Sequence, residues 1–180
     1  MKTSKNERFL ELASVISEWS KDPRTKVGAV LVGHKDQIIA QGYNGFPRKI
    51  GDTKERLNNR EVKNKLVIHA EMNAIYNAIH NGASTEGSTI YISGLPCCHE
   101  CAKGIIQTGI SKVVMDSTPE DSPEPWDKSG KLALELFKEA GVDVEFILNS
   151  KESNVVQEVQ EVQELLPDSE KITGASLIWV

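Results

Sequence analysis

The chain has 180 residues, of which 39% are hydrophobic and 26% are charged, a balance that is ordinary for one globular domain with a packed core. Its net charge of −5 disfavours a general nucleic-acid-binding protein, because such proteins normally carry an excess of basic residues. No apolar run approaches the roughly 20 residues of a membrane span, so we expect neither a membrane nor a nucleic-acid partner.

Hydrophobic periodicity predicts helices that alternate with strands over most of the chain. Apolar residues at helical spacing, such as Phe9, Ile16 and Trp19, predict an amphipathic helix over residues 5–21. The other expected helices span 54–65, 68–80, 98–108 and 131–140, and the expected strands span 27–32, 37–43, 88–93, 110–115 and 142–148. This alternation is typical of a layered α/β fold with a largely buried central sheet.

Two stretches interrupt the alternation. Residues 117–126 are acidic and rich in proline, so we expect a loop beyond the end of a strand, where ligands commonly bind. After residue 150, valines recur on one helical face of a segment that is either a partly ordered tail or a surface for a neighbouring subunit. We therefore expect a main domain over residues 1–149 and a C-terminal extension over residues 150–180.

Two motifs predict a metal site. His69 and Glu71 begin one expected helix, and Cys98 and Cys101 begin another. One histidine with two cysteine thiolates is typical of a Zn²⁺ site whose fourth position stays open, which is the catalytic form. The N-termini of both helices would favour thiolate over thiol.

The cysteines lie together in the sequence, since all three fall within residues 97–101. This grouping offers no disulfide framework and indicates a reducing, cytoplasmic setting. A structural zinc site would need a fourth ligand, for which Cys97 and His99 are the candidates. Adjacent residues seldom reach one ion, so we expect Cys97 to be a packing thiol and His99 a surface or pocket-wall residue. Pro96 precedes Cys97 rather than Cys98, which leaves open which of the two cysteines binds the metal.

The same motifs predict a hydrolytic reaction. Zn²⁺ lowers the pKa of a bound water to about 7, and Glu71 would carry the proton to a ring nitrogen and to the leaving ammonia. The pattern H-x-E…P-C-x-x-C is that of zinc nucleobase deaminases. The alternative is that the negative charge of Glu71 only stabilises the positive end of the helix dipole.

Four blocks of sequence, two of which contain the metal motifs, carry a resemblance to a known family. They are residues 22–29 (DPRTKVGA), 42–47 (GYNGFP), 69–75 (HAEMNAI) and 98–103 (CHECAK). With them the chain resembles the deoxycytidylate (dCMP) deaminase family, within the cytidine-deaminase-like superfamily, over residues 5–148. The resemblance implies a three-layer α/β/α fold around a mixed sheet of about five strands. It implies conversion of dCMP to dUMP and ammonia, which supplies a precursor of dTTP.

The resemblance also implies roles for individual residues. It makes His69, Cys98 and Cys101 the ligands of one zinc ion, with Glu71 as the proton shuttle. The substrate-binding residues that it implies are Arg24 at the phosphate, Asn44 at the sugar hydroxyl, Ala70, and Trp126 as an aromatic residue closing over the nucleotide. For Arg24 the alternative is a surface position in a turn, and for Trp126 it is a core position.

In the family, the block at residues 42–47 belongs to a regulatory site at subunit contacts. There dCTP with Mg²⁺ activates and dTTP inhibits a hexamer, which implies allosteric roles for Gly42, Tyr43, Asn44, Gly45 and Pro47. The alternative is a turn whose glycines serve geometry alone. Several relatives bind a second zinc ion through extra Cys and His residues, but residues 47–68 contain neither type, so we expect one zinc per chain.

Three other functions stay open at this point. The enzyme could act on dCTP as well as, or instead of, dCMP, since nothing in the sequence fixes how many phosphates the pocket holds. A tRNA or single-stranded DNA deaminase would need a basic, aromatic groove, which the acidic composition disfavours. A non-catalytic zinc module would leave Glu71 without a purpose.

Overall fold

The computed structural model describes residues 3–148 of the chain. The expected division into a domain over residues 1–149 and an extension over residues 150–180 stays a prediction. The extension, with both interpretations of it, lies outside the described residues. The helices are α1 (Lys5–Ser17), α2 (Lys54–Asn58), α3 (Arg60–Leu66), α4 (Ala70–His80), α5 (His99–Gln107) and α6 (Trp126–Ala140). The strands are β1 (Gly28–Val32), β2 (Ile38–Tyr43), β3 (Thr89–Ser93), β4 (Lys112–Met115) and β5 (Asp143–Phe146).

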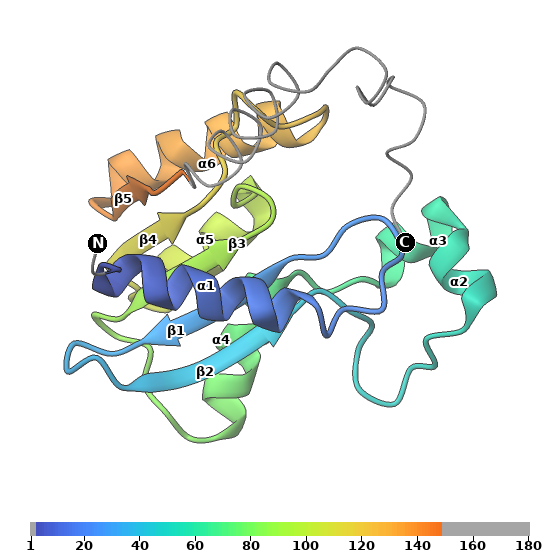
Figure 1. Cartoon of the computed structure of the whole chain (residues 1–180), viewed down its shortest axis with the longest axis horizontal. Helices are drawn as coiled ribbons and strands as arrows, with labels where there is room; N and C mark the ends of the chain where they lie inside the picture. The colour runs from blue at the N-terminus through green and yellow to red at the C-terminus, as the bar shows by residue number, and fades with distance from the viewer. Residues whose placement is uncertain (1–2, 149–180) are drawn as a thin grey trace, which may run out of the picture. The chain divides into compact units, whose positions relative to one another are not determined.

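The strands form one mixed sheet in the order β2-β1-β3-β4-β5 (Figure 1). β1 pairs antiparallel with β2 and with β3, whereas β3–β4 and β4–β5 are parallel pairs. The parallel pairs need crossover connections, and these are the helices α5 and α6. The predicted α/β fold with a five-stranded mixed sheet is confirmed.

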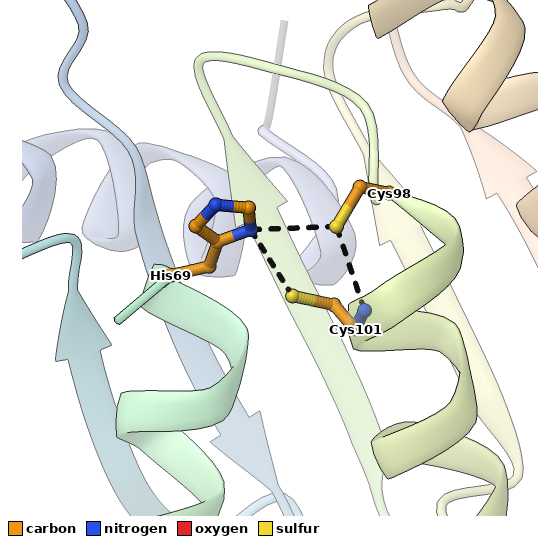
Figure 2. Close-up of side chains that lie close together, drawn as sticks. All are labelled: His69, Cys98 and Cys101. Atoms are coloured by element: carbon orange, nitrogen blue, oxygen red, sulfur yellow. Dashed lines mark hydrogen bonds between the residues drawn. The ribbon is translucent and has the colours of Figure 1, made fainter. Parts of the chain in front are cut away.

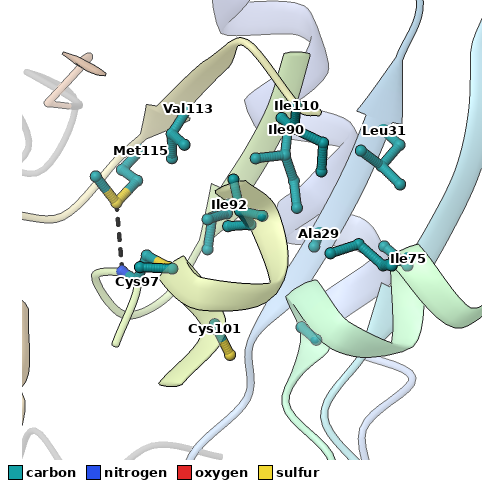
Figure 3. Close-up of a cluster of buried hydrophobic side chains, with 14 of the residues drawn as sticks. Ala29, Leu31, Ile75, Ile90, Ile92, Cys97, Cys101, Ile110, Val113 and Met115 are labelled. Carbon is teal, nitrogen blue, oxygen red and sulfur yellow. Dashed lines mark hydrogen bonds between the residues drawn. The ribbon is translucent and has the colours of Figure 1, made fainter. Parts of the chain in front are cut away.

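The two faces of the sheet bury different side chains, because successive residues of a strand point to opposite faces. Val30, Val32, Tyr91 and Val114 belong to a small core with the apolar residues of α1. The alternate strand residues join a larger core with α4, α5 and α6 (Figure 3). This larger core contains Ala29, Leu31, Ile75, Ile90, Ile92, Ile105, Val113, Met115 and Phe137. Helices on both faces therefore give the expected three layers.

Helix α1 is shorter than the periodicity predicts. After Ser17 the backbone hydrogen bonds tighten to three-residue spacing, with the amides of Glu18, Trp19 and Ser20 each bonding three residues back. Trp19 therefore follows the helix and is 55% exposed, although its spacing matches the apolar face.

The expected helix over residues 54–65 is two helices joined at Asn59. That residue has extended backbone (φ −83°, ψ 102°), ends α2 and caps α3 by accepting a hydrogen bond from the Val62 amide. An asparagine at such a position competes with the helix through its side chain, which explains the break.

Helix α6 begins five residues earlier than expected, at Trp126. In the sequence, Gly130 argues against a helix there, since glycine is a weak helix former. In the fold it lets α6 lie directly against Pro119, where a side chain would meet the ring carbons at 2.9 Å. Trp126 therefore begins a helix instead of ending a loop.

Among the helices of residues 3–148, none combines the length and the apolar character needed to cross a lipid bilayer.

Candidate metal centre and active-site pocket

The metal motifs lie at the start of two helices. His69 is the N-cap residue of α4 and Cys98 that of α5, both in extended backbone. Two backbone hydrogen bonds between Gly45 and Ile68, of 2.8 and 3.1 Å, fix the segment that leads into His69. The two helix N-termini meet at one place, as the sequence predicts, and their dipoles favour anionic thiolates there.

Three side chains converge between these helix starts (Figure 2). The Nδ1 atom of His69 lies 3.3 Å from the Sγ atom of Cys98 and 3.4 Å from that of Cys101. All three ligand atoms lie within 4.8 Å of one another, and they form the one such group of three found among residues 3–148.

This group fits a zinc ion. Tetrahedral zinc with bonds of about 2.1 Å to nitrogen and 2.3 Å to sulfur would separate those atoms by about 3.6 Å, close to the spacing observed. A hydrogen bond from Cys101 lowers the pKa of Cys98, while the same contact raises the pKa of Cys101. One thiolate is thus already favoured, and metal binding would displace the remaining thiol proton. Two sulfurs and one imidazole nitrogen leave room for a fourth ligand from solvent or substrate.

Cys97 and His99 lie outside this group. Cys97 is 1% exposed in the larger core, its amide donates to the Met115 sulfur at 3.3 Å, and burial raises the pKa of its thiol (Figure 3). His99 shares a hydrogen bond of 2.8 Å with Ser129 on α6. Cys97 is therefore a packing residue of the core, whereas the His99 side chain is 38% exposed and lies at the surface.

Glu71 lies in the first turn of α4, two residues beyond His69, and is 3% exposed. Burial raises the pKa of its carboxyl group, and the nearby His69 opposes that effect. A carboxyl group held beside the open position of a metal group is suited to accept a proton and to return it.

Glu71 and His69 line a cavity of about 270 Å³. Ala70 and Trp126, both predicted to bind substrate, line it too, and the Trp126 ring centre lies 5.7 Å from that of His69. The remaining lining residues are Asp22, Thr25, Val27, Asn44, Lys63, Asn64, Val67, Leu95, Pro96 and Pro125. The cavity therefore combines apolar walls with a few convergent polar groups, which is the usual make-up of a small-molecule site.

Asn44 is buried in the cavity wall and holds its neighbouring turn. Its Oδ1 atom accepts from the Val27 amide at 2.8 Å, and its Nδ2 atom donates to the Thr25 carbonyl at 2.9 Å. An amide side chain has one more donor hydrogen and one more lone pair, so a ligand hydroxyl can still be bound.

Arg24 has a different orientation from the one that its predicted role requires. Its guanidinium donates to the Asn58 carbonyl at 3.2 Å, on the exposed side of the turn. Among the described residues that line the cavity, Lys63 is the one lysine or arginine.

Lys63 and Asp22 form a pair that the sequence does not reveal. The Lys63 Nζ atom lies 2.7 Å from the Asp22 Oδ2 atom, and their side chains are only 10% and 6% exposed. Burial raises the pKa of Asp22, but hydrogen bonds from Lys63 and from the Arg24 and Thr25 amides outweigh that effect and lower it. In the sequence, Lys63 lies in a charged helix and looks no different from Lys65, so no local signal marks it.

The predicted regulatory residues do not share one environment. Tyr43, Asn44 and Gly45 line a second cavity of about 60 Å³, which shares Asp22, Asn44, Lys63 and Val67 with the first. Gly42 faces α4 instead, and a side chain there would meet the backbone of that helix. Pro47 is half-buried and lies outside the described lining of either cavity.

The three-layer fold, the metal group and the cavity that His69 and Glu71 line define the class of a hydrolytic zinc-binding deaminase. The sequence matches the family described as "Cytidine and deoxycytidylate deaminase zinc-binding region" over residues 3–117, and the chain belongs to this family. The resemblance to the dCMP deaminases is thereby confirmed.

Individual relatives agree with this assignment. A protein of Aliivibrio fischeri described as an "uncharacterized deaminase in luxG 3'region" is 39% identical over 140 residues, covering 78% of this chain and 91% of the relative. Mouse deoxycytidylate deaminase is 39% identical over 142 residues, covering 76% of this chain and 75% of the relative. The crystal structure of dCMP deaminase from cyanophage S-TIM5 in complex with dCMP and dUMP is 27% identical, with a TM-score of 0.64. The matched region covers 82% of this chain and 99% of the phage protein.

Proposed function

We propose that the protein hydrolyses dCMP to dUMP and ammonia in the cytoplasm and so supplies a precursor of dTTP. The observation that carries the reaction type is the buried carboxyl group of Glu71, which lines the same cavity as His69 of the metal group. The similarity to proteins named deoxycytidylate deaminase, one of them crystallised with dCMP and dUMP, supports the substrate.

In this proposal His69, Cys98 and Cys101 hold one zinc ion per chain. When bound, the ion would act as a Lewis acid and lower the pKa of a water molecule at its fourth position. Glu71 accepts the proton from the attacking water at a carboxylate oxygen and returns it to N3 of the cytosine ring. It then transfers the second proton of the water to the amino group, which leaves C4 as ammonia while the water oxygen becomes the carbonyl of uracil.

The cavity wall would bind the rest of the nucleotide. Asn44 would bind the sugar hydroxyl through its remaining donor and acceptor, while Ala70 packs against the base and Trp126 closes over it. Arg24 would have to leave the Asn58 carbonyl and turn toward the cavity before it could bind the phosphate. Deamination of dCTP beside or instead of dCMP is the second candidate, because the described cavity does not limit the number of phosphates.

Regulation by nucleotides is the further part of the proposal. We expect dCTP with Mg²⁺ to activate and dTTP to inhibit a homohexamer through Gly42, Tyr43, Asn44, Gly45 and Pro47. The second cavity supports this expectation, since three of these residues line it and Asn44 faces both cavities.

One assay tests the proposal. Purified zinc-loaded protein is offered cytidine, dCMP, dCTP and a cytosine-containing oligonucleotide, and ammonia release and uracil product are followed. We expect turnover of dCMP, with a sigmoidal rate curve that becomes hyperbolic when dCTP is added. Zinc binding without turnover of any of these compounds would refute the enzymatic function, and turnover of the oligonucleotide alone would favour the polynucleotide deaminase.

A further inference from the structure

The buried pair of Lys63 and Asp22 joins two parts of the chain that are 41 residues apart. Lys63 comes from the short helix α3, and Asp22 begins the turn at residues 22–27 that leads into β1. Both residues line the cavity that His69 and Glu71 also line, and both line the second cavity. The pair therefore lies in the wall between these cavities.

The two oxygens of Asp22 divide their bonds between these parts of the chain. Oδ1 accepts from the amides of Arg24 and Thr25 at 2.9 and 3.2 Å, which closes the turn. Oδ2 accepts from Lys63 at 2.7 Å. The same turn holds Asn44, whose side chain bonds the Thr25 carbonyl and the Val27 amide. A continuous chain of hydrogen bonds thus runs from α3 to the cavity wall.

We propose that Lys63 is a positioning residue for substrate binding: through Asp22 it holds the turn at residues 22–27, and with it Asn44, in the shape that the nucleotide requires. A buried charge left without its partner is strongly unfavourable, so the pair has one stable arrangement and ties α3 to the turn. Lys63 acts through Asp22 in this proposal, and the substrate's phosphate is not its ligand.

The proposal rests on the proposed function for its kinetic readout, and the test separates the two. The variants are Lys63→Met, Lys63→Arg and Asp22→Asn/Lys63→Met, with Lys65→Met as the control. Lys65 lies on the same helix, but its ion pair with Glu61 is exposed. The measurements are zinc content, KM and kcat for dCMP, dissociation constants of dUMP and deoxyuridine, and hydrogen exchange of the Arg24 and Thr25 amides.

We expect Lys63→Met to keep zinc and to raise KM by about tenfold, with kcat little changed. A 1 Å displacement of a positioning group can lower the rate roughly a hundredfold, and the effect of a small shift of the cavity wall should be smaller. Binding of dUMP and of deoxyuridine should weaken by the same factor. The Arg24 and Thr25 amides should lose protection, Lys63→Arg should restore most of the binding, and Lys65→Met should change nothing.

The double variant covers the case in which Lys63→Met fails to fold. It leaves no unpaired carboxylate, and the side-chain oxygen of the introduced asparagine can still accept from the two backbone amides, so stability should return while KM stays raised. An unchanged KM in a folded variant that lacks Lys63 would overturn the proposal. So would a loss of dUMP binding with deoxyuridine binding intact, because that result would make Lys63 a direct phosphate ligand. If the wild type does not turn over dCMP, the proposed function fails, while product binding and the amide exchange still decide the role of Lys63.

Discussion

Gly42 offers a test of how the metal site is held, because it is the point where β2 touches the start of α4. A Cβ atom at this position would come closest to the Ala74 amide nitrogen and would lie 2.5 Å from the Ala70 carbonyl oxygen. Ordinary contact begins near 3.4 Å, so the Ala70 contact alone requires α4 to withdraw by about 0.9 Å, and the closer Ala74 contact brings the movement to about 1 Å. That movement displaces the helix turn that carries His69 and Glu71.

The expected cost has two parts. Overpacking of this kind destabilises a core by about 1–3 kcal/mol, and the reduced freedom of alanine in the unfolded chain returns about 0.4–1 kcal/mol of that. A displacement of nearly 1 Å at the proton shuttle should lower kcat/KM by roughly 10- to 100-fold. The variant should therefore unfold at lower denaturant concentration and turn over dCMP slowly, even when saturated with zinc.

The measurements are denaturant unfolding, zinc content and kcat/KM, each beside Gly51→Ala as the control. Gly51 is exposed, and a Cβ atom there would lie 3.8 Å from the Thr53 methyl group, which is ordinary contact. Unchanged stability and activity in Gly42→Ala would refute the packing argument. A variant that keeps basal activity and loses only its response to dCTP would show that Gly42 serves the regulatory site instead.

Three further predictions concern single side chains. Cys98→Ser should lose zinc in metal analysis, whereas Cys97→Ser should keep it, and the opposite pattern would exchange their roles. Glu71→Gln should bind zinc as the wild type does while turnover falls by about 10²- to 10⁴-fold, and retained turnover would remove its role as proton shuttle. The folded-state pKa of Asp22 lies below the ordinary value of 3.8, so its stabilisation is present above that pH and is lost as acid protonates the folded state. Asp22→Asn should therefore unfold with a weaker pH dependence below about pH 4 in acid denaturation, and an unchanged pH dependence would contradict the contribution of this carboxylate.

The sequence predicts that His69, Cys98 and Cys101 lie together, because the signal for this group is local. His69 and Cys98 each begin a helix, so the pattern that marks the ligand also marks the backbone that presents it. The positions of the strands follow from periodicity in the same way. These features depend on a few neighbouring residues and need no knowledge of the rest of the fold.

The features that the sequence does not reveal depend on distant partners. Lys63 differs from Lys65 only because Asp22 lies opposite it, 41 residues away in the chain. Gly130 weakens the pattern of α6, yet its close contact with Pro119 is what the helix requires. The orientation of Arg24 is set by the carbonyl of Asn58, at the end of α2, which a motif comparison cannot supply.

The position of the ligands at helix starts has a consequence for the metal-free protein. Within the described residues, the His69 side chain makes no capping hydrogen bond to α4, and the Cys98 cap of α5 is a weak sulfur acceptor at 3.4 Å. A metal bridging these residues would cross-link two helices through a loop of about 30 residues, which restricts the unfolded chain. Removal of zinc by a chelator should therefore fray the first turns of α4 and α5 before the sheet unfolds. The ion would then stabilise the fold as well as take part in the reaction.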